Sequence, residues 1–90
     1  MIEVKTAVAN ALEFLGQMYP EGQIMDPRLE EVELSGDFSA WCVTLSFMTR
    51  GEPRELAAVI RGGGARRLYK VITVEGETGK VQSMKMRQTV

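Results

Sequence analysis

The chain has 90 residues, of which 44% are hydrophobic and 26% are charged. This length supports one hydrophobic core and this composition is typical of globular proteins, so we expect a single domain spanning residues 1–90. The sequence contains no histidine and one cysteine, Cys42. It therefore has no internal disulfide, no paired-cysteine zinc site and none of the catalytic triads that depend on histidine.

The net charge of −1 conceals an uneven distribution. Residues 1–49 carry eight acidic and two basic side chains, a net −6, whereas residues 50–90 carry nine basic and four acidic ones, a net +5. One interpretation is that acidic and basic strands pair with each other in one sheet. The other is an electrically polar surface that steers a binding partner.

The first residues, Met1 to Lys5, lack the basic start and continuous apolar core of a secretory signal. No apolar run is long enough to cross a bilayer. We therefore expect a cytoplasmic protein with no membrane partner.

Residues 3–19 carry the clearest periodic pattern. Projected at about 100° per residue, their apolar side chains fall on one arc about 160° wide. They are Val4, Ala7, Val8, Ala11, Leu12, Phe14, Leu15, Met18 and Tyr19. This width predicts an amphipathic helix that lies on a sheet, and Pro20 ends it because proline disfavours helical geometry at the preceding residue.

A loop through Asp26 and Pro27 is expected next, followed by strands at roughly 29–35, 40–49, 67–75 and 80–88. Turn residues at 35–37 and 77–79 predict two hairpins, with Gly79 suited to a positive φ. The fold class predicted is α+β, with one N-terminal helix packed on a four-stranded antiparallel meander.

The inward faces of these strands follow from their alternation. In 40–49, the apolar residues Trp41, Val43, Leu45 and Phe47 alternate with Cys42, Thr44, Ser46 and Met48 and predict the core face. In 80–88, Met84 and Met86 mark the inward face. In 67–75, two sets alternate, Leu68, Ile72 and Val74 against Tyr69, Val71 and Thr73, and the pattern favours neither.

Residues 50–66 have no clear assignment, and they form a connection that is long for a hairpin. Pro53 followed by residues 54–60 is compatible with a short helix within this connection. The segment and its end gather a candidate contact site for a protein partner or an anion. It consists of Arg54, Arg61, Gly62, Gly63, Gly64, Arg66 and Arg67. Successive glycine N–H groups form an anion-binding nest, and guanidinium groups hold phosphate by paired hydrogen bonds.

Other chemistry is not supported by the sequence. Residues 76–80 resemble a phosphate-binding loop, but the glycine spacing is short and Val81 stands where Ser or Thr must bind magnesium. The acids Glu30, Glu31 and Glu33 lack a histidine or an acceptor pocket for general acid–base work. Cys42 lies within a predicted strand without a positively charged neighbour to activate it. We therefore expect no enzyme, no cofactor and no metal.

The run from Tyr69 to Val81, YKVITVEGETGKV, resembles the closing hairpin of PepSY domains: an aromatic residue, alternating apolar residues, an acidic turn, Thr-Gly, a charged residue and Val. The resemblance implies a cystatin-like arrangement of helix and sheet and a non-catalytic module that binds or inhibits other proteins.

Taken together, these patterns predict a protein-binding or regulatory module with a protein partner. The two unpaired edges of a four-stranded sheet also favour a homo-oligomer. The acidic isoelectric point, about 5.4, argues against nucleic acid. The alternative is a small-ligand or anion-binding domain that uses residues 61–67.

Overall fold

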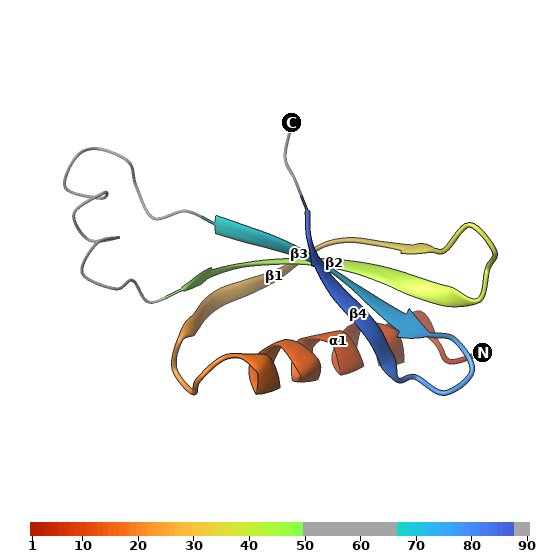
Figure 1. Ribbon diagram of the computed structural model, residues 1–90, viewed down its shortest axis with the longest axis horizontal. Helices are drawn as coiled ribbons and strands as arrows, with labels where there is room; N and C mark the ends of the chain where they lie inside the picture. Colours follow the sequence, from red (N-terminus) through yellow and green to blue (C-terminus); the bar gives the residue numbers. More distant parts are fainter. Residues whose placement is uncertain (50–66, 88–90) are drawn as a thin grey trace.

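The computed structural model describes residues 1–49 and 67–87, which form one helix and four strands (Figure 1). In chain order they are α1 (Val4–Met18), β1 (Ile24–Leu34), β2 (Ala40–Thr49), β3 (Arg67–Glu75) and β4 (Val81–Met86). The strands form one antiparallel sheet in the order β1-β2-β3-β4, and α1 packs against one face of it. The predicted α+β class and meander are confirmed.

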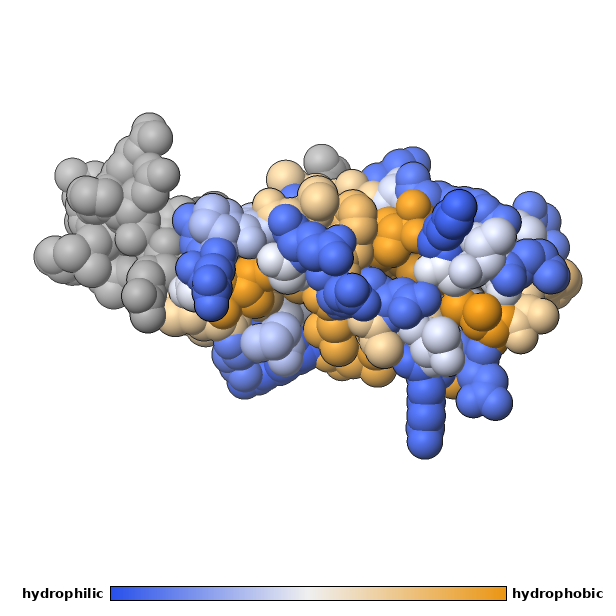
Figure 2. All heavy atoms as spheres, turned by 90° about the horizontal axis from the view of Figure 1, so that it is seen from below, coloured by the Kyte–Doolittle hydropathy of each residue, from blue (hydrophilic) through white to orange (hydrophobic). Residues whose placement is uncertain are grey.

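The helix follows the arc that the sequence predicts. Ala7, Ala11 and Leu15, spaced four residues apart, are at most 1% exposed and form its contact line with the sheet. Two of the three are alanines, which allow the helix backbone to approach the strands closely. Tyr19, the residue before Pro20, has an extended backbone, so the helix ends at Met18. Seen from the helix side, apolar patches remain visible between hydrophilic side chains (Figure 2).

Strand β2 supplies the centre of the core. Val43, Leu45 and Phe47 are fully buried, and the half-buried Trp41 packs beside them and donates from Nε1 to the Ile2 carbonyl at 3.2 Å. The predicted inward face of this strand is confirmed. On β3 the structure selects the set that the sequence left open, because Ile72 and Val74 are fully buried and Leu68 packs against the core.

Strand β4 matches its prediction only in part. Met84 packs against the core, but Met86 is 69% exposed although it alternates onto the same face. Its register partner on β3 is the charged residue Lys70, and β4 is an edge strand of the sheet. Met86 therefore has no buried apolar neighbour on the adjacent strand. The predicted inward face of β4 is thus confirmed at Met84, but the expectation that Met86 also lies against the core was wrong.

Strand β1 begins at Ile24, five residues before the predicted start, and the expected loop through Asp26 and Pro27 is part of it. Its pairing with β2 shifts by one residue between Met25 and Arg28, and again between Leu29 and Glu31. These shifts are β-bulges, and Asp26 occupies the first with φ of 49°. Because β1 is an edge strand, a bulge accommodates Pro27, which has no N–H to donate.

Both hairpin turns lie at the same end of the sheet, beside the N-terminal segment. Gly76 donates its N–H to the Ser39 carbonyl at 2.9 Å, and the Gly76 carbonyl accepts from the Ile2 N–H at 2.7 Å. Gly79 has φ of 75°, as predicted, and its carbonyl accepts from Asn10 Nδ2 at 2.9 Å. These bonds fix the first half of α1 relative to the β3–β4 hairpin.

Candidate functional site

Of the contact residues predicted from the sequence, only Arg67 lies within the described part of the chain. The others lie outside the described residues: Arg54, Arg61, Gly62, Gly63, Gly64 and Arg66. Arg67 is the first residue of β3 and pairs with Met48 near the end of β2. It is therefore the C-terminal residue of the predicted contact site, which extends from Arg54 to Arg67.

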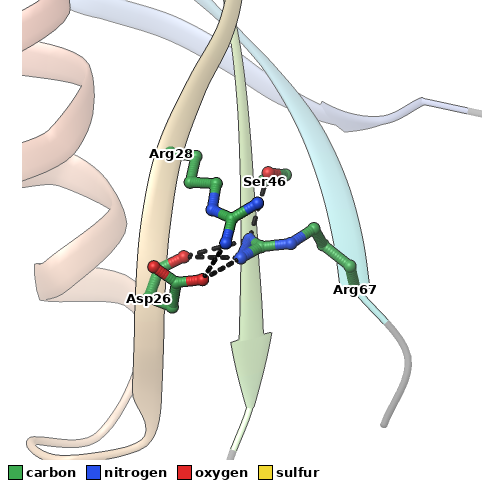
Figure 3. A network of polar contacts seen from close by, with 4 residues as sticks. All are labelled: Asp26, Arg28, Ser46 and Arg67. Carbon is green, nitrogen blue, oxygen red and sulfur yellow. Dashed lines mark hydrogen bonds and ion pairs between the residues drawn. The ribbon is translucent and has the colours of Figure 1, made fainter. Parts of the chain in front are cut away.

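The Arg67 guanidinium belongs to a polar network on the sheet face that α1 leaves uncovered (Figure 3). Its two terminal nitrogens donate to the Asp26 backbone carbonyl at 2.9 and 3.0 Å, and Nη2 also binds Asp26 Oδ2. Nη1 donates to Ser46 Oγ at 3.2 Å. The Arg67 side chain is only 17% exposed. The bulge at Asp26 allows these hydrogen bonds, because the carbonyl and the carboxylate of Asp26 both face the Arg67 guanidinium.

A second guanidinium shares the same carboxylate. Arg28 Nη2 lies 2.8 Å from Asp26 Oδ2, and the Arg28 side chain is 61% exposed. The hydrogen bond from Arg67, with the further bond and charge of Arg28, lowers the pKa of Asp26 below its ordinary value. The three side chains together carry one net positive charge at neutral pH. Of the two guanidinium groups, that of Arg28 is the more accessible to solvent. This network can attract an anion, although Arg67 is largely engaged within the protein.

The rest of the uncovered face is mainly polar. Alternation places Glu31, Thr44, Val71 and Lys85 in one row across the four strands. Thr44 and Ser46 on β2 are at most 5% exposed although they lie on the face that α1 does not cover. Arg87 Nη1 lies 3.5 Å from Glu31 Oε2, so this ion pair joins the two edges of the sheet across its central strands. Within the described residues, the Asp26–Arg67 and Glu31–Arg87 ion pairs thus connect nonadjacent parts of the sheet, whereas Asp26 and Arg28 pair within β1. The edge strand β1 carries mainly acidic side chains, and the edge strand β4 carries the basic Lys85.

The backbone of the edge strand β4 defines a second feature. The Arg87 N–H donates to the Tyr69 carbonyl at 3.0 Å, so Arg87, Lys85 and Ser83 direct their N–H and C=O groups toward β3. In an antiparallel pair this direction alternates, so Met84 and Met86 direct theirs away from the sheet. Among residues 1–49 and 67–87, no strand pairs with that side of β4.

On the opposite edge the same reasoning applies to the second half of β1. The Ser35 N–H donates to the Ala40 carbonyl at 2.8 Å, and Glu33 and Glu31 pair with Cys42 and Thr44. Val32 and Leu34 therefore direct their backbone groups outward. The sequence predicts unpaired sheet edges without identifying the residues that form them. The alternation of acids with Val and Leu in 31–34, and of Met with bases in 84–87, indicates strands, and its opposite charges are the signal that distinguishes these two segments.

A shallow hollow of about 280 Å³ lies between α1 and the β3–β4 hairpin. It is lined by Asn10, Glu13, Phe14, Gln17, Gly79, Lys80 and Val81. The Asn10 amide nitrogen is already bound to the Gly79 carbonyl, and the hollow is open to solvent.

Groups for metal or thiol chemistry are not assembled in the part of the chain that the structure describes. No cluster of three or more acidic or cysteine side chains there could hold a metal ion. Cys42 is a free, half-buried thiol on β2. The described helix is not long and apolar enough to cross a membrane.

Comparisons with protein-family models, with curated proteins and with solved structures find no match to this chain.

Proposed function

We propose that this protein is a non-catalytic protein-binding module that holds an extended segment of its partner along β4. One observation carries the proposal: Met84 and Met86 present backbone donors and acceptors on the outer side of a sheet edge. An extended segment can pair with such an edge as a fifth strand, with backbone hydrogen bonds giving affinity and side chains giving specificity.

The side chains of β4 support this use of the edge. Met86 is 69% exposed, so it offers an apolar contact to an added strand on the helix side. Lys85 and Arg87 alternate with it and lie on the uncovered face. An added strand thus meets an apolar row on one face and a basic row on the other. A partner that alternates apolar and acidic residues fits both rows.

The resemblance of residues 69–81 to PepSY domains supports the same class of function, because it implies a binding module with a cystatin-like arrangement. One helix on a four-stranded antiparallel meander agrees with that arrangement. The absence of histidine from the chain agrees with a non-catalytic role. Its single cysteine suits the reducing conditions of the cytoplasm, where we expect the protein to act.

A panel of labelled octapeptides tests the proposal. Their even positions are valine and their odd positions are glutamate, serine or lysine, and binding is followed by fluorescence polarisation. The glutamate peptide should bind best. Met86→Pro should abolish this binding because it removes an outward N–H while sparing the ladder to β3. Met86→Ala keeps that N–H and is the matched control, expected to retain most of the binding. If no peptide binds, or if Met86→Pro binds as well as wild type, the proposal is wrong.

Anion binding is the second candidate, and the shared carboxylate of Asp26 favours it. Arg28 and Arg67 both contact this carboxylate, and Arg67 directly follows residues 50–66 in the chain. Within this group of three described side chains, the two guanidinium groups exceed the carboxylate by one positive charge. A thermal-shift titration with inorganic phosphate, against sodium chloride at equal ionic strength, is the test. A phosphate-specific rise in melting temperature that is reduced in Arg28→Met supports this candidate, because a ligand that binds the folded state stabilises it. An equal response to both salts rejects it.

A further inference from the structure

The two edges of the sheet are complementary to each other in charge and in pattern. Glu31-Val32-Glu33-Leu34 on β1 alternates acids with apolar residues, and Met84-Lys85-Met86-Arg87 at the end of β4 alternates apolar residues with bases. We infer that the segment held by β4 is β1 of a second copy of this chain, so that copies join head to tail into a longer antiparallel sheet. This inference rests on the proposed use of β4 as a docking edge.

Strand direction is the first requirement, and the sheet meets it. The four strands alternate in direction, so β4 runs opposite to β1. A second copy placed beside β4 in the same orientation therefore presents its β1 antiparallel to it. The helices of the two copies then lie on the same face, separated by four strands or about 19 Å. Since packed helices need only about 10 Å between their axes, they do not collide.

The hydrogen-bonding groups match in one particular register. Val32 and Leu34 direct their backbone groups outward from β1, as Met86 and Met84 do from β4. Pairing Val32 with Met86 and Leu34 with Met84 joins these four residues in two hydrogen-bonded pairs. On the helix side of the new sheet this register places apolar side chains opposite apolar side chains.

The same register matches the charges on the other face. Glu33 then stands opposite Lys85, in a pair whose Cα atoms approach to about 4.5 Å. Glu31 stands opposite Arg87, the residue type with which it already forms an ion pair within its own chain. That internal pair is long, at 3.5 Å, and both side chains are more than 40% exposed, so exchanging it for a pair between copies costs little.

Other features restrict the contact to this register. Pro27 and the two bulges keep the first half of β1 from pairing regularly with another strand. Two β4 strands meeting each other would place bases near bases, and two β1 strands would place acids near acids. Lys85 and Arg87 thus disfavour pairing between like edges and favour the acidic edge of the next copy.

Sedimentation equilibrium with charge-reversed variants tests the inference. The wild-type protein should associate weakly and reversibly, less so as salt is raised, because the contact depends on exposed charges. Glu33→Lys and Lys85→Glu should each weaken association by roughly tenfold, because each replaces an attraction with a repulsion. An equimolar mixture of the two variants should recover wild-type association, since the reversed β1 of one then meets the reversed β4 of the other.

Recovery on mixing separates this contact from damage to the fold, which mixing would not repair. Glu13→Lys and Lys5→Glu on α1 are the matched controls, because they change the net charge equally without altering residues 31–34 or 84–87, which form the proposed contact. A wild-type protein that remains monomeric at all concentrations, or a mixture that does not recover, overturns the inference. The proposed function fails separately, through the response of peptide binding to Met86→Pro.

Discussion

The rings of Tyr19 and Phe47 meet edge to face, with centroids 5.3 Å apart and planes inclined at 67°. Phe47 is fully buried on β2, and Tyr19 directly follows α1. This contact fixes the C-terminal end of the helix over the sheet, while the bond from the Ile2 N–H to the Gly76 carbonyl fixes the other end. The helix is thus held at both ends and is a structural layer that covers one face of the sheet.

Leu15→Asp should unfold the domain. Leu15 is 1% exposed, and an unpaired carboxylate at that position costs several kcal/mol against a total stability of about 5 to 15 kcal/mol. Leu12→Asp is the control on the same helix, since Leu12 is 39% exposed and the new carboxylate can reach water. Circular dichroism melts should show a cooperative transition for the control only. Cooperative melting of Leu15→Asp near the wild-type temperature would contradict the packing of α1.

Arg67→Met should lower the melting temperature by about 5 °C, and Arg28→Met by clearly less. Arg67 is mostly buried and binds the carbonyl and carboxylate of Asp26 as well as the buried Ser46, so its removal breaks the bonds between β3 and β1 and leaves the Ser46 hydroxyl without this donor. Arg28 makes one exposed ion pair, which contributes little. Differential scanning calorimetry of both variants measures the order. Equal shifts would show that Arg67 does not anchor β3 to β1.

The Asp37 carboxyl should titrate near pH 2 in the folded protein. Its Oδ1 accepts hydrogen bonds from the hydroxyls of Ser39 and Ser35, both at 2.7 Å, and from the Ser39 N–H at 3.1 Å. Led by the Ser39 hydroxyl, these bonds lower the pKa of Asp37 to about 2 from 3.8. Because the folded pKa lies below the unfolded one, the stabilisation is present above about pH 4 and is lost as pH falls through 2.

Carbon-13 NMR of the carboxyl resonances measures this titration directly. In a Ser35→Ala, Ser39→Ala double variant, the midpoint should move up toward 3.8 because the two hydroxyl donors are gone. A midpoint near 3.8 in the wild type would mean that the turn does not hold the carboxylate as described.

Gly76→Ala should destabilise the fold, whereas Gly36→Ala should not. A Cβ at residue 76 would lie 2.8 Å from the Ser39 carbonyl oxygen and 2.9 Å from Met1 Cε, and the backbone oxygen cannot move aside without breaking the contact between the two hairpins. A Cβ at residue 36 meets nothing within 4 Å. We expect a loss of about 1 to 3 kcal/mol for the first, measured by urea denaturation. If both variants melt alike, the two turns do not pack as closely as the structure indicates.

The sequence alone determined the elements whose signal is local. The arc of residues 3–19 predicted the helix because its period matches 3.6 residues per turn, and the alternation in 40–49 predicted the buried face of β2. The turn at 77–79 followed from the freedom of Gly79 to adopt a positive φ. The class of fold followed from these elements and their order.

Other features depend on which strands become neighbours in the sheet and which become its edges. The sequence near Asp26 and Pro27 predicted a loop, but an edge strand tolerates a bulge there, and the bulge brought Asp26 to Arg67, 41 residues away. The inward face of β3 and the exposure of Met86 were likewise set by the position of each strand in the sheet. A periodic pattern records which side of a strand is apolar, whereas partners and free edges arise only when distant segments pair.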